Sequence, residues 1–115
     1  MDDRSQVMVF DFHTHTFLSD GALSPVELIR RAAHNGYAVV AIADHVGTGN
    51  CTEVLRQVIR DCKLCSRFWN ILAIPAVELT HVPAGAIAEV ARLAKEGGAR
   101  LVLVHGETIV EPVEP

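Results

Sequence analysis

Short apolar runs alternate with amphipathic stretches along this chain. Four runs are of strand length and cover residues 7–12, 38–43, 71–77 and 100–104. The run at 38–43 is continuously apolar, as in a strand that is buried on both faces. Pro75 removes one backbone donor from the third run and predicts a sheet edge or a bulge there. The pattern therefore predicts four strands.

The first amphipathic stretch carries start and stop signals for a helix. Ser24 is suited to the N-cap position, Pro25 to the first helical position, and Glu27 to the return half of a capping box. Gly36 is suited to a left-handed residue just past the last turn. We expect a helix that begins at Pro25 and ends near Gly36.

Two further helices are predicted. Asn50 with Glu53 repeats the capping pattern and begins a helix that extends to about residue 67. Residues 83–96 have apolar positions at helical spacing and end at Gly97 and Gly98. The tail, residues 107–115, is expected to be extended or loose because it holds two Glu-Pro pairs.

The order of these elements is β-α-β-α-β-α-β with short links. It indicates parallel strands joined by right-handed crossovers, which is an α/β fold. A chain of 115 residues fits one domain, here residues 1–115. The net charge of −4 argues against a nucleic-acid footprint. With no long apolar segment and no signal peptide, no membrane partner and a cytoplasmic location are expected.

Three cysteines allow two interpretations. Cys62 and Cys65 form a C-x-x-C pair, which occurs in zinc sites and redox pairs. The same two residues and Cys51 also lie on one apolar stripe at helical spacing, where a free cysteine acts as a small hydrophobic residue. We favour core packing for all three.

Each predicted strand is followed by residues that can bind a metal ion. The carboxyl ends of parallel strands meet at one edge, so side chains from different strands gather there. A single His-x-His is equally consistent with ordinary polar residues at the start of a loop. Potential ligands at four successive strand ends favour a metal site instead. These residues are His13 and His15 after the first strand, Asp44 and His45 after the second, Glu78 after the third and His105 after the fourth. His81 fits either a contact to the site or an ordinary loop residue.

The ordered set of motifs resembles the amino-terminal half of the PHP (polymerase and histidinol phosphatase) superfamily of metal-dependent phosphoesterases. The matching segments are His13-Thr14-His15, Ser19-Asp20-Gly21, Ala43-Asp44-His45, Val77-Glu78 and Val104-His105. The resemblance implies about half of a distorted (β/α)7 TIM-like barrel, with two or three divalent ions at the strand ends.

The resemblance also implies roles. His13, His15 and Glu78 would hold one metal, Glu78 and His105 a second, and Asp20 with His45 a third. Glu78, His105 and Asp44 form the implied catalytic set, with Asp44 supporting the neighbouring ligand. The implied reaction is histidinol-phosphatase-like: a metal-activated water hydrolyses a small phosphomonoester. Nitrogen and oxygen ligands suit zinc, manganese or iron.

The chain departs from the family in its second half. The later histidine and the Asp-x-His motif have no counterpart here, and about half of the barrel is absent. We therefore expect weak activity from the isolated chain, and either a longer parent or association, with itself or another chain, over the exposed half-barrel. The alternative function is a non-catalytic PHP-like module for metal binding or association.

Overall fold

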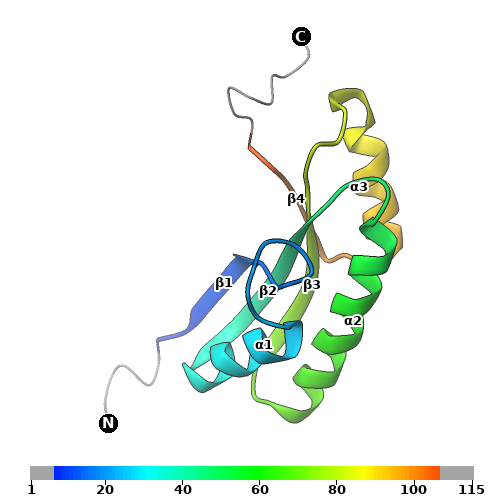
Figure 1. Cartoon of the computed structure of the whole chain (residues 1–115). Helices are drawn as coiled ribbons and strands as arrows, with labels where there is room; N and C mark the ends of the chain where they lie inside the picture. Colours follow the sequence, from blue (N-terminus) through cyan, green and yellow to red (C-terminus); the bar gives the residue numbers. More distant parts are fainter. Residues whose placement is uncertain (1–6, 107–115) are drawn as a thin grey trace.

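A computed structural model describes residues 7–106 of the chain. Strands and helices alternate along it (Figure 1). In chain order the elements are β1 (Val9–Thr14), α1 (Pro25–His34), β2 (Tyr37–Val46), α2 (Cys51–Phe68), β3 (Leu72–Leu79), the 3-10 turn η2 (Ala84–Ala86), α3 (Ile87–Glu96) and β4 (Leu101–Val104). The predicted tail and Glu107 onward lie outside the described residues.

The four strands form one sheet in the order β1-β2-β3-β4, and every neighbouring pair is parallel. The helices lie together on one side of this sheet (Figure 1). Because every crossover helix returns on the same side, the sheet curls with its helix-free face on the inside. The fold is thus an α/β half-barrel, consistent with part of a TIM-like barrel, as predicted.

The core lies between the sheet and the helices. Ile42, Val77 and Leu79 of the sheet meet Ile29 of α1 and Val58 of α2, and all five are almost fully buried. The opposite face of the sheet carries a second, smaller cluster made of Ala41, Ala43 and Ala76, against which Ile74, Leu101 and Leu103 pack. Small alanines on this face fit the narrow interior of a tightly curved sheet.

The edge strand β1 leaves large apolar side chains exposed. Phe10 and Phe12 are each about half exposed, and their ring centroids lie 6.1 Å apart. Val104 on β4, at the other edge of the sheet, is also exposed. Within the described residues, both edges of the half-barrel therefore present apolar surface.

Strands β1, β2 and β3 continue two or three residues beyond the predicted ends. The expected strands ended at residues 12, 43 and 77, whereas the observed ones end at Thr14, Val46 and Leu79. The apolar runs stop earlier because the polar residues His13, Asp44 and Glu78 interrupt them, whereas the backbone pairing continues past these residues. His13, His45 and Glu78 therefore lie on strands rather than in loops.

The prediction of an edge or bulge at Pro75 is wrong. The β2–β3 register runs without a shift through Ile42 opposite Pro75, and β3 is an interior strand. The Pro75 carbonyl accepts from the Arg100 N–H (2.8 Å), immediately before β4 begins to pair at Ala76. The absent N–H of Pro75 is therefore tolerated because Pro75 directly precedes the first residue of β3 that pairs with β4. The irregular strand is β1, whose pairing with β2 shifts twice.

The helix caps follow the sequence only in part. Ser24 caps α1, since its hydroxyl accepts from the Glu27 N–H (3.1 Å), and Gly36 takes a φ of 81°. Asn50 precedes α2 but makes no side-chain cap; its Oδ1 accepts from the Gly47 N–H (2.8 Å) instead. The third helix begins later than predicted, at Ile87, because residues 84–86 form a tighter turn.

The three cysteines are buried and unbonded, which confirms core packing. Burial raises the pKa of Cys62 to about 12, an effect reinforced by neighbouring Cys65 and Asp61. A thiol with so high a pKa is a poor metal ligand or nucleophile. Among the described residues, no helix has the length and apolar character needed to span a bilayer.

Glu27 should give stability a pH dependence in acid. Its carboxylate accepts from Arg30 (2.7 and 2.8 Å) and Arg31 (2.9 Å), and these hydrogen bonds lower its pKa from 4.5 to about 2. The stabilisation is present above about pH 4.5 and is lost as the pH falls toward 2. We expect urea unfolding to show Glu27→Gln slightly less stable than the unaltered chain at pH 7, with the difference closing in acid. A difference that stays constant with pH would contradict this.

Candidate metal centre

Glu78 is the centre of a three-residue cluster at the carboxyl end of the sheet. Its Oε1 lies 2.9 Å from His13 Nε2 and 2.8 Å from His15 Nε2. The two Nε2 atoms are 3.2 Å apart. We call His13, His15 and Glu78 the inner triad; one ligand atom from each lies within 4.8 Å of the others.

A second cluster lies beside the first. Asp20 Oδ1 is 2.8 Å from His15 Nδ1, and Asp20 Oδ2 is 3.2 Å from His45 Nε2. We call His15, Asp20 and His45 the loop triad, because Asp20 lies on the loop between β1 and α1. The predicted grouping of Asp20 with His45 thus corresponds to a real proximity.

His15 belongs to both triads, a sharing that the sequence did not indicate. Its Nε2 faces Glu78 while its Nδ1 faces Asp20. A ring that offers one nitrogen to a metal commonly donates from the other to a carboxylate, which sets its orientation. The geometry of the two triads is therefore coupled through a single imidazole.

The histidines hold both carboxylates in the charged form. Partial burial would by itself raise the pKa of Glu78, but the hydrogen bond and charge of His13, with help from His15 and His45, lower it below its ordinary value. Desolvation likewise opposes ionisation of Asp20, and the charges of His15 and His45 outweigh it, so that its pKa is lowered as well. A charged carboxylate is the form that binds a cation.

Thr80 contacts the ring of His45. The Thr80 hydroxyl donates to the Glu78 carbonyl (3.1 Å) and lies 2.7 Å from His45 Nδ1. If the hydroxyl proton is used in this way, the hydroxyl would accept from Nδ1–H, and Nε2, which faces Asp20, would be the nitrogen available to a metal. Sequence reasoning missed Thr80, since a hydroxyl two residues after Glu78 has no distinctive spacing.

Asp44 lies beneath the triads rather than among them. It is fully buried, and its oxygens accept from Thr16 N–H (2.7 Å), Thr16 Oγ1 (2.7 Å) and Ser19 Oγ (2.6 Å). A carboxylate so enclosed does not face a substrate, which is compatible with the supporting role that the resemblance implies for Asp44. Its expected contact with the neighbouring His45 is indirect, because Ser19 Oγ accepts from the His45 backbone N–H (3.2 Å).

His105 and His81 lie at the same end of the molecule without joining a triad of the described part. The His105 ring centroid is 5.3 Å from that of His45, and its backbone N–H donates to the Leu79 carbonyl. The predicted pairing of His105 with Glu78 on one metal is not among the two triads. His81 is exposed and has a φ of 58°, an unusual value for a residue other than glycine.

The donor chemistry of both triads fits a divalent metal ion. Each offers imidazole nitrogens and a carboxylate oxygen, a set that suits zinc, manganese or iron. Three protein ligands also leave an open coordination position, as in catalytic sites. The residues present are therefore compatible with the divalent ions that PHP-like motifs imply.

Gly21 permits the close packing of the loop that carries Asp20. A Cβ at this position would lie 2.4 Å from the His15 carbonyl oxygen and 3.0 Å from the Thr16 carbonyl carbon, both backbone atoms. We expect Gly21→Ala to lower the free energy of unfolding by about 1–3 kcal/mol and to weaken metal binding, because the loop must shift. Gly49→Ala, which would meet nothing within 4 Å, is the matched control. Equal behaviour of the two variants in urea unfolding would contradict the expectation.

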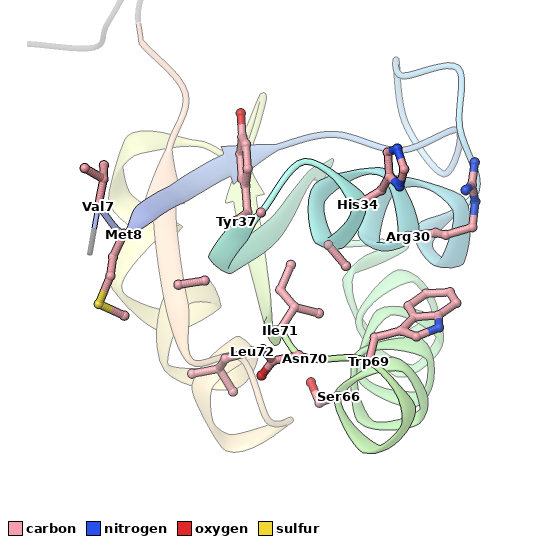
Figure 2. A pocket seen from close by; sticks show the side chains of 13 residues that line it. Val7, Met8, Arg30, His34, Tyr37, Ser66, Trp69, Asn70, Ile71 and Leu72 are labelled. Atoms are coloured by element: carbon pink, nitrogen blue, oxygen red, sulfur yellow. The ribbon is translucent and has the colours of Figure 1, made fainter. Parts of the chain in front are cut away.

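A hollow at the opposite end of the sheet has no comparable order. Its lining includes Arg30, His34, Ser66, Trp69 and Asn70. Figure 2 shows that the polar side chains of Arg30 and His34 do not converge with those of Ser66 and Asn70 on one point. The chemistry-bearing residues are thus concentrated at the carboxyl end of the strands.

Comparisons with known proteins agree with the motifs. The profile of the PHP domain matches residues 11–104. An uncharacterized protein of Methanocaldococcus jannaschii is 46% identical over 108 residues, which cover 93% of this chain and 50% of that protein. A 5'-3' exoribonuclease of Escherichia coli is 30% identical over 82 residues, covering 71% of this chain and 26% of the enzyme. A 3',5'-nucleoside bisphosphate phosphatase of Chromobacterium violaceum is 44% identical over 50 residues, covering 44% and 18%.

Proposed function

The chain belongs to the PHP domain family, and from that premise we propose that it is a metal-dependent phosphoesterase which hydrolyses a small phosphomonoester. The observation that carries the proposal is the meeting of two metal-type triads on one shared imidazole, His15. The chain spans half or less of the length of the relatives named above, so activity of the whole protein is part of the proposal.

The side chains of the two triads and their neighbours would have different roles. His13, His15 and Glu78 would hold one divalent ion, and Asp20 and His45 would hold another, with the Nδ1–H of the shared His15 donating to Asp20. When bound, such ions supply Lewis-acid chemistry, making water more acidic and neutralising phosphoryl charge. Thr80 presents His45 Nε2 to the site, and Glu78 and Asp20 supply the negative charge that attracts cations. His105, beside His45, would border the substrate.

We further propose a small phosphorylated molecule as the substrate, with no membrane partner. The net charge of −4 disfavours a long polyanion, whereas bound cations would supply local positive charge for a single phosphate. The apolar edge residues Phe10, Phe12 and Val104 support association that covers the half-barrel, by a second copy or another chain.

A second candidate is cleavage of nucleotide phosphoesters. It is favoured by the relatives, since one named above is a 5'-3' exoribonuclease and another a 3',5'-nucleoside bisphosphate phosphatase. The third possibility, a metal-binding module without turnover, differs only in the absence of hydrolysis.

The experiment is a phosphate-release assay with added Mn²⁺ or Zn²⁺. p-Nitrophenyl phosphate reports phosphomonoester hydrolysis, a nucleoside 3',5'-bisphosphate and a short 5'-phosphorylated RNA report the second candidate, and calorimetry with each metal reports binding. The assay is run on this chain and on any longer parent form. Metal-dependent release from p-nitrophenyl phosphate supports the proposal. Bound metal with no turnover in either form would contradict it and favour the non-catalytic module.

A further inference from the structure

The loop between β1 and α1 carries two ligands of the loop triad, His15 and Asp20, and its backbone is held by hydrogen bonds. Its backbone closes on Thr16, whose carbonyl accepts from the N–H groups of Ser19 (3.1 Å) and Gly21 (2.9 Å). Thr16 is itself fully buried, although it is polar. The loop is therefore anchored through Thr16, between His15 and Asp20.

Asp44 on β2 supplies the anchor. Its carboxylate receives three short hydrogen bonds, two from Thr16 and one from Ser19, at 2.6–2.7 Å. The backbone and hydroxyl donors on Thr16 bind different oxygens of the carboxylate, so the position of Thr16 is specified in two directions. A buried carboxylate with three donors is costly to disturb, because any donor left without a partner loses its hydrogen bond in a dry environment.

The same network reaches the other histidine of the loop triad. Ser19 Oγ donates to Asp44 and accepts from the backbone N–H of His45. Asp44 also precedes His45 directly on β2, and their common strand is the element on which the loop is docked. One carboxylate thus ties the loop's two ligands, His15 and Asp20, to the strand that carries the third.

We propose that Asp44 is a positioning residue which, through Thr16 and Ser19, sets the geometry of the loop triad relative to the inner triad. This inference rests on the proposed function in so far as the triads bind metal. The proposal predicts a selective effect on metal binding. Loss of the anchor would move Asp20 and the Nδ1 edge of the His15 ring, whereas His13 and Glu78 are held by β1 and β3.

Asp44→Asn tests the proposal, because the amide keeps the shape but turns one acceptor oxygen into a donor facing hydroxyl and N–H groups. Mn²⁺ and Zn²⁺ binding is measured by calorimetry in two backgrounds. His13→Gln leaves only the loop triad complete, and Asp20→Asn leaves only the inner triad complete. We expect Asp44→Asn to weaken binding about 10–100-fold at the loop triad and by a smaller factor at the inner triad.

Two milder variants keep the test decisive if Asp44→Asn does not fold. Thr16→Val removes one donor at nearly constant shape and should repeat the selective loss, whereas Thr16→Ser keeps the hydroxyl and should retain binding. Asp44→Asn combined with Thr16→Val should be no worse than the more severe single variant, because both break the same contact.

The possible outcomes separate the inference from the proposed function. Equal weakening of metal binding at both triads, or no weakening at either, would overturn the positioning role of Asp44 and leave the proposed function intact. Absence of metal binding by the unaltered chain and by its longer parent would overturn the proposed function, and this inference with it.

Discussion

Glu78→Gln is expected to abolish metal binding at the inner triad and to reduce metal-dependent phosphate release at least about 100-fold. Changing a residue that only orients a ligand already costs about 10–100-fold, and Glu78 would contact the metal directly. Its Oε1 is the common partner of His13 and His15, and the residue is 5% exposed. A neutral amide keeps the shape but removes the charge between the two imidazoles. Calorimetry with Mn²⁺ and the p-nitrophenyl phosphate assay measure the two effects.

The matched control for Glu78→Gln is Glu89→Gln, which makes the same change of charge on the exposed face of α3. It should bind metal and release phosphate like the unaltered chain. Circular dichroism shows whether both variants are folded. Full metal affinity in a folded Glu78→Gln variant would contradict the assignment of Glu78 as a ligand.

His15→Gln is expected to eliminate binding at both triads, whereas His13→Gln and Asp20→Asn should each eliminate one. The reason is that His15 presents Nε2 to the inner triad and Nδ1 to the loop triad. With His15 replaced, the inner triad loses one of its ligands, and Asp20 of the loop triad loses the N–H group that orients it. The number of metal ions bound per chain, from calorimetry and elemental analysis, measures the effect.

His34→Gln is the control for the histidine series, because His34 is an exposed residue at the end of α1, outside both triads. It should leave the number of bound ions unchanged. If His15→Gln lost no more ions than His13→Gln, the shared role of His15 would be refuted and the loop triad would not be a site of its own.

The elements were predictable where the sequence carries a local signal that is strong on its own. The helix α1 begins at Ser24 and Pro25 as expected, because the Ser24 hydroxyl accepts from a backbone N–H of the first turn. Asn50 carries a similar signal, but its side chain binds Gly47 in the preceding loop. Where a second donor lies nearby, the path of the loop determines whether the side chain caps the helix, and no local sequence pattern contains that path.

The candidate site was predictable in its ligands but, apart from Asp44, not in its supports. His13, His15 and Glu78 were expected together, and their ligand atoms meet. Thr16, Ser19 and Thr80 were missed, although they hold Asp44 and His45 in place. Hydroxyl residues occur throughout loops, so only the distance to a buried partner distinguishes a structural hydroxyl from a solvated one.

The α/β order, the strand ends that carry polar residues and the residue types able to bind a metal follow from the amino-acid sequence alone. They depend on periodicity and on the chemistry of individual side chains. The folded chain is needed to see that His15 contacts both triads, that Asp44 lies beneath the site and that Pro75 is accommodated in an interior strand. Those properties depend on contacts between β1, β2 and β3, whose residues are far apart in the chain, and such contacts exist only once the strands have paired.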